Sequence, residues 1–257
     1  MVSANYTWAG SRDFDSHHPC DSKGVPLSAE TGISLVTLRA LPIFQALDDK
    51  TLVPIARVSS LRSVPRQSVV LRAGDRTDNV YFVLTGAFKV LVSDEEGREV
   101  ILSMMGPGDF FGEMGVIDDH PRSATVQAAH SSELVVIAKA DFHRCLADSF
   151  DVSLYIMRSL VHRLRAADRQ IESLALLDVY GRVARLLLDM AERTEDGRLM
   201  VPQKVSRQDI AKMIGASREM VSRVMKDLQL RGLVHEVDGQ LELLEDVADT
   251  LSQAPSE

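Results

Sequence analysis

The sequence predicts an α+β protein in which an antiparallel β-roll (a jelly roll), a long amphipathic helix and a C-terminal helical unit follow one another. Three observations support this prediction. Short apolar segments of period two alternate with glycine turns from Val58 to Ile137, a repeat of helical spacing begins at Phe150, and two short capped helices follow residue 205. Evenly spaced short strands are typical of small barrels and jelly rolls, whereas a period of three to four residues indicates helices.

The composition excludes several classes of protein. The 257 residues suffice for two domains, and 45 % hydrophobic residues with a mean hydropathy close to zero are typical of a soluble globular chain. Two cysteines, Cys20 and Cys145, exclude a disulfide framework and are too few for an iron–sulfur cluster. Because no apolar run reaches membrane-spanning length and the N-terminus lacks the pattern of a signal peptide, we expect a cytoplasmic protein with no membrane partner.

The first part of the chain divides into an arm and the predicted roll. Residues 1–32 are rich in Ser, Asp, His, Gly and Pro without periodicity, so we expect a flexible arm. Residues 33–149 are expected to form the roll domain. A short helix begins after Asp48, whose side chain can cap it, and directs Leu52, Ile55 and Ala56 inward.

One stretch of the roll, GEMGVIDDHPRSATV over residues 112–126, places two charges inside a run that otherwise reads as buried sheet. Glu113 and Arg122 flank a short turn-forming segment. Charges enclosed by apolar strands are costly unless they are paired and hydrogen-bonded. The two residues therefore either neutralise each other or hold a molecule that the chain itself does not provide.

Residues spaced three and four apart, all of them apolar except Ser153, predict a long helix over residues 150–176. They are Phe150, Ser153, Met157, Leu160, Leu164, Ala167, Ile171 and Leu174. An unbroken heptad pattern favours a coiled-coil homodimer, and the alternative is a helix packed on its own sheet. A second amphipathic helix, DVYGRVARLLLDMAE, follows, and Asp178 is expected to cap it at a hinge.

Residues 177–247 have the pattern of a winged helix-turn-helix, and residues 248–257 are expected to form a tail. Ser206 and Asp209 form a capping box, Gly215-Ala216 makes a tight turn, and Ser217 caps a second helix that ends near Leu230. The expected shared core consists of Ile210, Ile214, Val221, Val224 and Leu228. Beyond these helices, Asp238-Gly239 between alternating residues indicates a type I′ hairpin, which would form the wing.

The charge of this region favours a polyanionic partner. The whole chain has a net charge of −8, yet residues 201–235 contain seven Lys or Arg and three Asp or Glu, a local charge of +4. Arginine can bind guanine through two hydrogen bonds, and glutamate can accept one from cytosine. We expect base contacts from the second helix and phosphate contacts from both helices. The candidate DNA-binding residues are Arg207, Gln208, Ser217, Arg218, Glu219, Ser222, Arg223 and Lys226.

Three segments, GEMGVIDDHPRSATV, LALLDVYGR and SRQDIAKMIGASREMVSRVMKDL, resemble the cAMP receptor protein/FNR (CRP/FNR) family of bacterial transcription regulators. The resemblance covers about residues 38–244. It implies a cyclic-nucleotide-binding β-roll, a homodimer along the long helix, and a winged helix-turn-helix that binds a palindromic operator in double-stranded DNA. It also implies RNA polymerase as a partner, and neither catalysis nor a metal. An enzyme with Glu113 as general base is disfavoured because no nucleophile–base pair, metal cluster or phosphate loop accompanies it.

The resemblance also implies roles for individual residues. In cAMP-binding members, the residue matching Glu113 bonds the ribose 2′-hydroxyl, those matching Arg122 and Ser123 hold the cyclic phosphate, and Gly112 lets the backbone approach. One arginine, one hydroxyl and nearby N–H groups suit a phosphate monoanion. The expected ligand-binding residues are Gly112, Glu113, Met114, Arg122, Ser123, Ala124, Ala167 and Asp168.

One departure from the family concerns the base of the nucleotide. Where cAMP receptor protein has a Thr-Ser pair against adenine, this sequence has Ala167-Asp168. A carboxylate can accept two hydrogen bonds from guanine but only one from adenine. The expected effector is cAMP as first choice, with cyclic di-GMP or cGMP, or a ligand-independent regulator, as alternatives. Asp168 could also face solvent or pair with Arg165 or Arg169.

Overall fold

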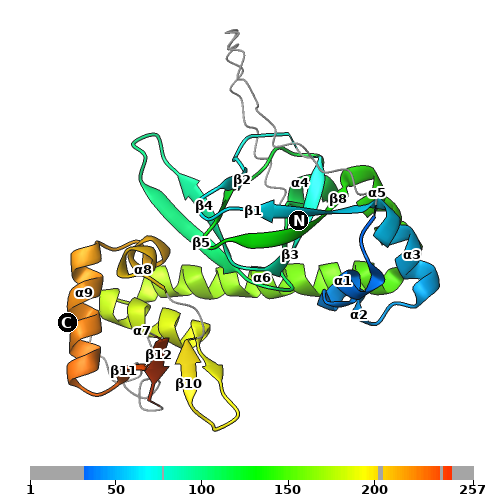
Figure 1. Ribbon diagram of the computed structural model, residues 1–257. Helices are drawn as coiled ribbons and strands as arrows, with labels where there is room; N and C mark the ends of the chain where they lie inside the picture. Colours follow the sequence, from blue (N-terminus) through cyan, green and yellow to red (C-terminus); the bar gives the residue numbers. More distant parts are fainter. Residues whose placement is uncertain (1–31, 77, 202–204, 238–239, 245–257) are drawn as a thin grey trace, which may run out of the picture.

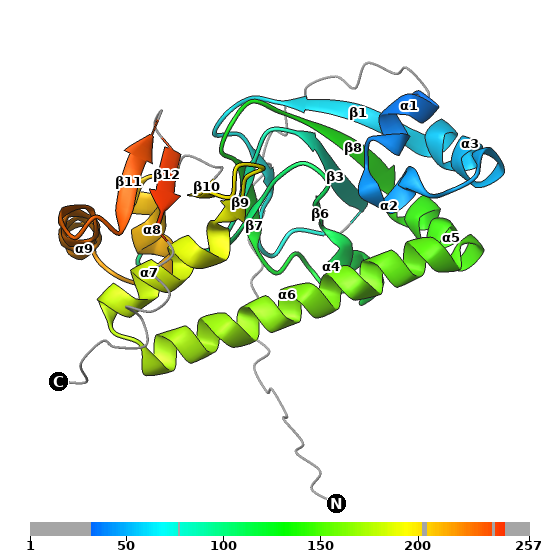
Figure 2. The same cartoon turned by 90° about the horizontal axis from the view of Figure 1, so that it is seen from below.

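The computed structural model describes residues 32–76, 78–201, 205–237 and 240–244 (Figure 1). The roll lies over one part of a long helix, and a smaller C-terminal domain lies at the other end of that helix (Figure 2). Residues 1–31 of the predicted arm (residues 1–32) and the predicted tail over residues 248–257 lie outside the described residues.

Three short helices precede the roll. They are α1 (Leu35–Arg39), α2 (Pro42–Gln45) and α3 (Asp49–Val58). The predicted cap of α3 is confirmed, because the Asp48 carboxylate accepts from the Thr51 amide at 2.9 Å. The predicted inward residues Leu52, Ile55 and Ala56 are buried.

The roll consists of two antiparallel four-stranded sheets, as the period-two segments predict. The first has the order β1 (Ser59–Val64), β8 (Ser132–Ala138), β3 (Asn79–Thr85) and β6 (Phe110–Phe111). The second has the order β2 (Val69–Leu71), β7 (Thr125–Ala128), β4 (Phe88–Ser93) and β5 (Glu99–Met105). Two helices complete the domain, α4 (Glu113–Ile117) and α5 (Lys139–Asp148).

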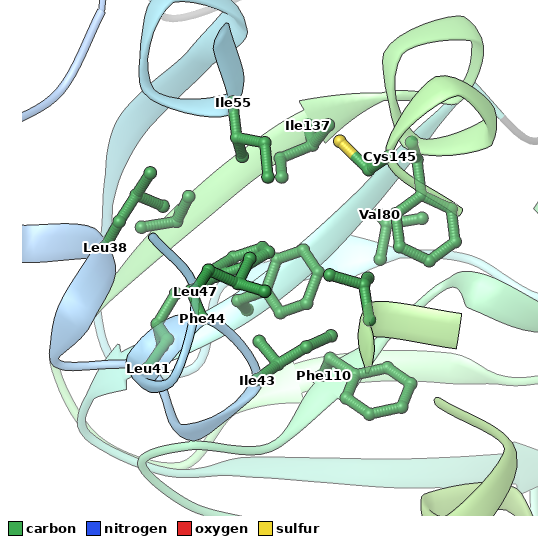
Figure 3. Close-up of a cluster of buried hydrophobic side chains, with 14 of the residues drawn as sticks. Leu38, Leu41, Ile43, Phe44, Leu47, Ile55, Val80, Phe110, Ile137 and Cys145 are labelled. Carbon is green, nitrogen blue, oxygen red and sulfur yellow. The ribbon is translucent and has the colours of Figure 1, made fainter. Parts of the chain in front are cut away.

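Side chains alternate between two cores because successive strand residues point to opposite faces. Phe88, Phe111 and Leu134 are among those buried between the sheets. Val80 and Phe82, on the other face of the first sheet, are among those that pack against the helices. Figure 3 shows part of this second core, in which Phe44, Val80, Phe110, Ile137 and Cys145 approach one another.

The long helix α6 spans Phe150–Leu176, as predicted, and begins at Ser149, which caps it. At 27 residues it is about 40 Å long. Val152 and Ile156 are buried against the roll core, and Leu160 packs partly against it. The predicted heptad seam is therefore wrong at Leu160, because the roll covers that side of the helix.

Apolar residues nevertheless remain exposed along one face of α6. They are Phe150, Met157, Val161, Leu164 and Ile171, here called the α6 stripe, and Leu174 and Leu176 near the end of the helix are exposed as well. Val161 takes the place that the sequence assigned to Leu160. Among the described residues no helix, α6 included, is long and apolar enough to cross a membrane.

The C-terminal domain, here called the reader domain, contains three helices and one sheet. The helices are α7 (Val179–Met190), α8 (Arg207–Ile214) and α9 (Arg218–Leu230). The sheet has the order β11 (Val234–Val237), β12 (Gln240–Leu243), β10 (Leu199–Val201) and β9 (Glu192–Arg193). The predicted wing hairpin is confirmed in its two antiparallel strands, β11 and β12, whereas its turn at Asp238-Gly239 lies outside the described residues.

The predicted caps of the reader helices are confirmed. Asp178, Ser206 and Ser217 accept backbone N–H groups at the starts of α7, α8 and α9, at 2.7, 3.1 and 3.2 Å respectively. Gly215 ends α8 with a φ of +64°, a left-handed conformation that glycine adopts readily. These local interactions define where the three helices begin and where α8 ends.

The shared core of α8 and α9 differs from the prediction at one position. Ile210, Ile214, Val221 and Leu228 are buried, but Val224 is only partly buried. Met225 is buried instead, because it lies four residues after Val221 and therefore on the same face of α9.

Candidate functional site

The segment that follows β6 forms a helix rather than the sheet that its apolar residues suggest. Gly112 has a φ of +86° and precedes α4, so Glu113 lies in the first helical turn. A Cβ atom at Gly112 would lie 2.5 Å from Nη1 of Arg122. The position therefore requires glycine for two reasons, its left-handed backbone and the close approach of this guanidinium.

Arg122 is buried at this point and contacts the backbone instead of a carboxylate. Its Nη1 donates to the Gly112 carbonyl at 2.7 Å and its Nη2 to the Asn79 carbonyl at 2.8 Å. Its Nε is buried without an acceptor among the described residues. Burial lowers the pKa of Arg122, and the nearby Tyr81 opposes this shift. The site thus holds a fixed cation with an unsatisfied donor.

Glu113 is paired, but with a residue of α6 and not with Arg122. The Arg163 Nη1 donates to Oε1 of Glu113 at 2.7 Å, and Arg163 also donates to the Phe110 carbonyl. The Arg163 guanidinium lies 4.6 Å from the centre of the Phe110 ring. Burial raises the pKa of Glu113, whereas the charge of Arg163 counteracts the shift. Glu113 and Arg122 therefore do not neutralise each other, because Arg163 provides the charge that pairs with Glu113.

The sequence reasoning missed Arg163. A signal was present, because Arg163 lies three residues after Leu160 and seven after Ile156, both of which contact the roll core. On a helix these spacings place it on the same face. A charged residue on the roll-facing side of α6 indicates a charged partner in the roll.

A cavity of about 70 Å³ opens between Glu113 and Arg122. Six of the eight predicted ligand-binding residues line it, namely Gly112, Glu113, Met114, Arg122, Ser123 and Ala124. The other lining residues are Leu71, Val90, Met105, Phe111, Gly115, Val126 and Arg163. The cavity therefore joins apolar walls to three charged side chains, Glu113, Arg122 and Arg163, and to the hydroxyl of Ser123.

The remaining two predicted residues do not reach this cavity within one chain. Ala167 and Asp168 are exposed and do not line it. Asp168 lies four residues after Leu164 and three before Ile171, so it belongs to the same face as the α6 stripe. This face points away from the roll to which Arg163 is bound.

The predicted DNA-binding residues lie on one accessible part of the reader domain. Arg207, Gln208, Ser217, Arg218, Glu219, Arg223 and Lys226 are exposed, and Ser222 is half-buried. In the described part of the chain, Arg218 and Arg223 form no ion pair. α9 lies on the outer side of the domain, away from the roll (Figure 1).

Contacts between the roll and the reader domain use α8 and leave α9 uncovered. Lys89 of β4 forms a 2.5 Å ion pair with Asp209, and Lys212 forms one with Glu99 of β5. Gln170 of α6 donates to the Met213 carbonyl at 3.2 Å. The arrangement seen here therefore keeps the candidate recognition helix accessible.

Known protein families match both the roll and the reader domain. The family model of the cyclic nucleotide-binding domain matches residues 61–149, and that of the Crp-like helix-turn-helix domain matches residues 181–246. The chain is 37 % identical over 183 residues to the cAMP-activated global transcriptional regulator Vfr of Pseudomonas aeruginosa, which covers 68 % of this chain and 84 % of Vfr. It is 35 % identical over 180 residues to the cAMP-activated global transcriptional regulator CRP of Pasteurella multocida, covering 68 % and 85 %.

A solved structure is also similar. The c-di-GMP responsive global regulator CLP of Xanthomonas campestris is 30 % identical, with a TM-score of 0.64 and coverage of 76 % of this chain and 99 % of CLP. These relatives are transcription regulators and not enzymes. The helix-turn-helix domain of such regulators is the part that matches residues 181–246 of this chain. The chain therefore belongs to the CRP/FNR family, as a DNA-binding transcription regulator with a cyclic nucleotide-binding domain.

Proposed function

We propose that this protein binds a palindromic operator as a homodimer and that a cyclic nucleotide in the roll cavity controls this binding. The observation that supports the control is Arg122, a buried guanidinium whose Nε has no acceptor among the described residues. A cation in this state favours an anion, and a phosphate can accept from several N–H groups at once.

Each end of the cavity suits one part of a nucleotide. Arg122 and the hydroxyl of Ser123 bind the cyclic phosphate, and Gly112 allows close approach of the ligand. Arg163 contacts one oxygen of Glu113, Oε1, and holds the carboxylate in place. Oε2 of Glu113 then accepts a hydrogen bond from the ribose hydroxyl.

A second copy of the chain completes the site. The cavity of about 70 Å³ is smaller than the roughly 300–1,000 Å³ usual for ligand sites. The α6 stripe supplies an apolar surface on which a second α6 can pack. Asp168 lies on that face, so it contributes to the partner's site rather than to its own, together with Ala167.

The base of the effector depends on Asp168. cAMP is the first choice, since two relatives named above are cAMP-activated regulators. Asp168 supports a second candidate, a guanine nucleotide such as cyclic di-GMP or cGMP, because a carboxylate accepts two hydrogen bonds from guanine. A relative that responds to c-di-GMP agrees with this candidate.

The nucleotide regulates DNA binding by favouring one arrangement of the dimer. α6 connects the cavity to the reader domain, and the chain turns at Asp178 between α6 and α7. Ligand bound between roll and α6 sets the two α9 helices at the spacing of one DNA turn, about 34 Å. This works only if the ligand binds the DNA-competent arrangement more tightly than the other. RNA polymerase is the proposed partner at the promoter.

Selection of DNA by the purified full-length protein tests this function. A library of random half-sites with varied spacing is enriched with no nucleotide, with cAMP, with cGMP and with cyclic di-GMP. We expect one nucleotide to raise the affinity for a palindrome at least tenfold. Equal affinity under all four conditions would reject nucleotide control and leave a ligand-independent regulator.

The variant Asp168→Ser distinguishes the two effector candidates. If Asp168 selects guanine, this variant loses the response to a guanine nucleotide. If cAMP is the effector, the response to cAMP persists. Arg165→Gln is the matched control, because Arg165 is also exposed on α6 but lies beside the stripe and not on it.

A further inference from the structure

A larger cavity lies between the roll and the reader domain, outside the proposed nucleotide site. Its volume is about 230 Å³. Four elements form its walls: β5, the last turns of α6, α7, and the end of α8. No role in the proposed function is assigned to it, yet it lies where the two domains meet.

The walls of this interdomain cavity are mainly apolar. Ile101, Leu102 and Met104 come from β5, Leu174 from α6, Leu186 and Met190 from α7, and Met213 and Ile214 from α8. Three of these eight side chains are methionines, which are flexible and adapt to differently shaped apolar groups. An apolar body of small size fits such a surface.

The polar lining of the cavity has an excess of positive charge. Arg169, Arg182 and Arg185 line it, against a single carboxylate, Asp189. Arg185 is paired with Asp189 at 3.5 Å. Arg169 and Arg182 have no acidic partner among the described residues, and Nε of Arg182 is buried without an acceptor. Two unpaired guanidiniums beside apolar walls favour an anionic group.

Dimerisation along the α6 stripe leaves this cavity open. Ala166 and Ser173 line the cavity, and each lies two residues after a member of the stripe, Leu164 and Ile171. Two residues correspond to about 200° around a helix. The cavity and the stripe are therefore on opposite sides of α6.

We propose that the interdomain cavity binds a small carboxylate with an apolar body, whose charge lies against Arg182 and Arg169. An apolar cavity of about 150 Å³ holds benzene, so 230 Å³ suits a ligand of about nine non-hydrogen atoms by the same proportion. The ligand class is a medium-chain fatty acid or a simple aromatic acid.

Binding at this place also affects the two domains. Both domains contribute walls, and Lys89–Asp209 and Gln170–Met213 hold them in this arrangement. A ligand that requires all four walls binds this arrangement and not one in which the reader domain has moved, so it stabilises the docked state. The carboxylate is thus a second ligand that acts on the arrangement of the two domains, and it binds at a site separate from that of the nucleotide.

Methyl NMR of the full-length protein with ¹³C-labelled methionine tests the proposal. The probe is octanoate, which has the required size, with acetate and octanol as controls for the charge and the apolar body alone. We expect saturable shifts of Met104, Met190 and Met213, which line the interdomain cavity, while Met114, which lines the nucleotide cavity, stays unchanged. Octanol and acetate are expected to bind at least tenfold more weakly.

Two variants and one control locate the site. Arg182→Gln is expected to weaken octanoate binding about tenfold or more, the usual effect of losing a charge-assisted hydrogen bond. Ala166→Phe is expected to weaken it by filling the cavity from α6. Arg165→Gln removes the same charge outside the cavity and is expected to leave binding unchanged.

Three results would overturn the proposal. The first is the absence of a saturable shift in the three methionines with octanoate. The second is a shift confined to Met114, which would place the ligand in the nucleotide cavity. The third is equal weakening by Arg182→Gln and Arg165→Gln, which would show attraction to the overall charge of α6 and α7. None of these results bears on nucleotide control, because the assay contains neither nucleotide nor DNA.

Discussion

The charged residues of the roll cavity and those of α9 occupy opposite environments. Glu113 and Arg122 are 2 % and 6 % exposed, and each is held by hydrogen bonds to other parts of the roll or to α6. Arg218, Glu219 and Arg223 are exposed on the first turns of α9. The same residue types therefore have different surroundings within one chain.

The difference shows how each region recognises its partner. A buried charge has a fixed position and loses much of its solvation, so it suits a small ligand of defined shape. Exposed arginines remain solvated and are free to adopt the rotamer that a base edge requires. Removing a charge should therefore affect folding and ligand binding in the roll cavity, but only DNA binding on the exposed face of α9.

Replacing Arg122 should have the largest effect. Arg122→Gln removes the donors to the Gly112 and Asn79 carbonyls, so the free energy of unfolding is expected to fall by about 1–3 kcal/mol. Nucleotide affinity should fall by about 2–5 kcal/mol, because the phosphate loses its cation. Urea unfolding and the nucleotide-induced shift in Tm measure the two losses, with Arg165→Gln as control. A variant of wild-type stability that still shows the shift would contradict the assigned role.

On the reader domain, Arg218→Ala should change DNA recognition without changing stability. We expect the free energy of DNA binding to become about 1–3 kcal/mol less favourable through loss of the contact to one guanine, and the preference for guanine at that position to be relaxed. Lys226→Ala should instead weaken binding to all DNA sequences similarly, and it should reduce the slope of log affinity against log salt concentration by about one. Fluorescence anisotropy with a panel of single-base substitutions at several salt concentrations measures both. If both variants lost selectivity equally, the division into base and phosphate contacts would be wrong.

The pH dependence of stability provides a subtler comparison. Because burial raises the pKa of Glu113 above 4.5, the unfolded chain releases this proton at lower pH than the folded one. The folded state then binds more protons in this window, so the free energy of unfolding falls as pH rises above 4.5, until the folded carboxyl is also ionised.

Glu113→Gln should remove this slope, whereas Glu95→Gln, at an exposed carboxylate, should retain it. Urea unfolding at a series of pH values above 4.5 measures the slope for each protein. Parallel curves for wild type and Glu113→Gln would show that burial does not control this carboxyl.

The interdomain ion pair should have the smallest effect. The side chains of Lys89 and Asp209 are 23 % and 17 % exposed. Their exposure is thus intermediate between that of the buried charges in the roll cavity and that of the exposed charges on α9. A double-mutant cycle with Lys89→Gln and Asp209→Asn is expected to give a coupling of about 0.5–1 kcal/mol. Urea unfolding measures it, and a coupling of zero would mean that the pair does not hold the reader domain on the roll.

Local interactions made much of the fold predictable from sequence. Asp48, Asp178, Ser206 and Ser217 cap helices through backbone groups only three residues away. Such contacts depend on neighbouring residues alone, so the helix starts follow from residue type and spacing. The period-two segments similarly predicted the strands of the roll.

Contacts between distant segments were not predictable. The pairing of Glu113 with Arg163 spans 50 residues, and the packing of Leu160 on the roll depends on where the sheets lie. The interdomain cavity also needs four elements in place. For the candidate site, the sequence identified six residues of the nucleotide cavity through the resemblance, but not the arginine on α6 that positions Glu113.

Nucleotide binding is measured by calorimetry of the purified full-length protein with cAMP, cGMP and cyclic di-GMP. We predict saturable binding of one of these nucleotides to the wild type, with loss of binding in Arg122→Gln and retention in Arg165→Gln. Failure of all three nucleotides to bind the folded dimer, or equal binding to wild type and Arg122→Gln, would contradict it.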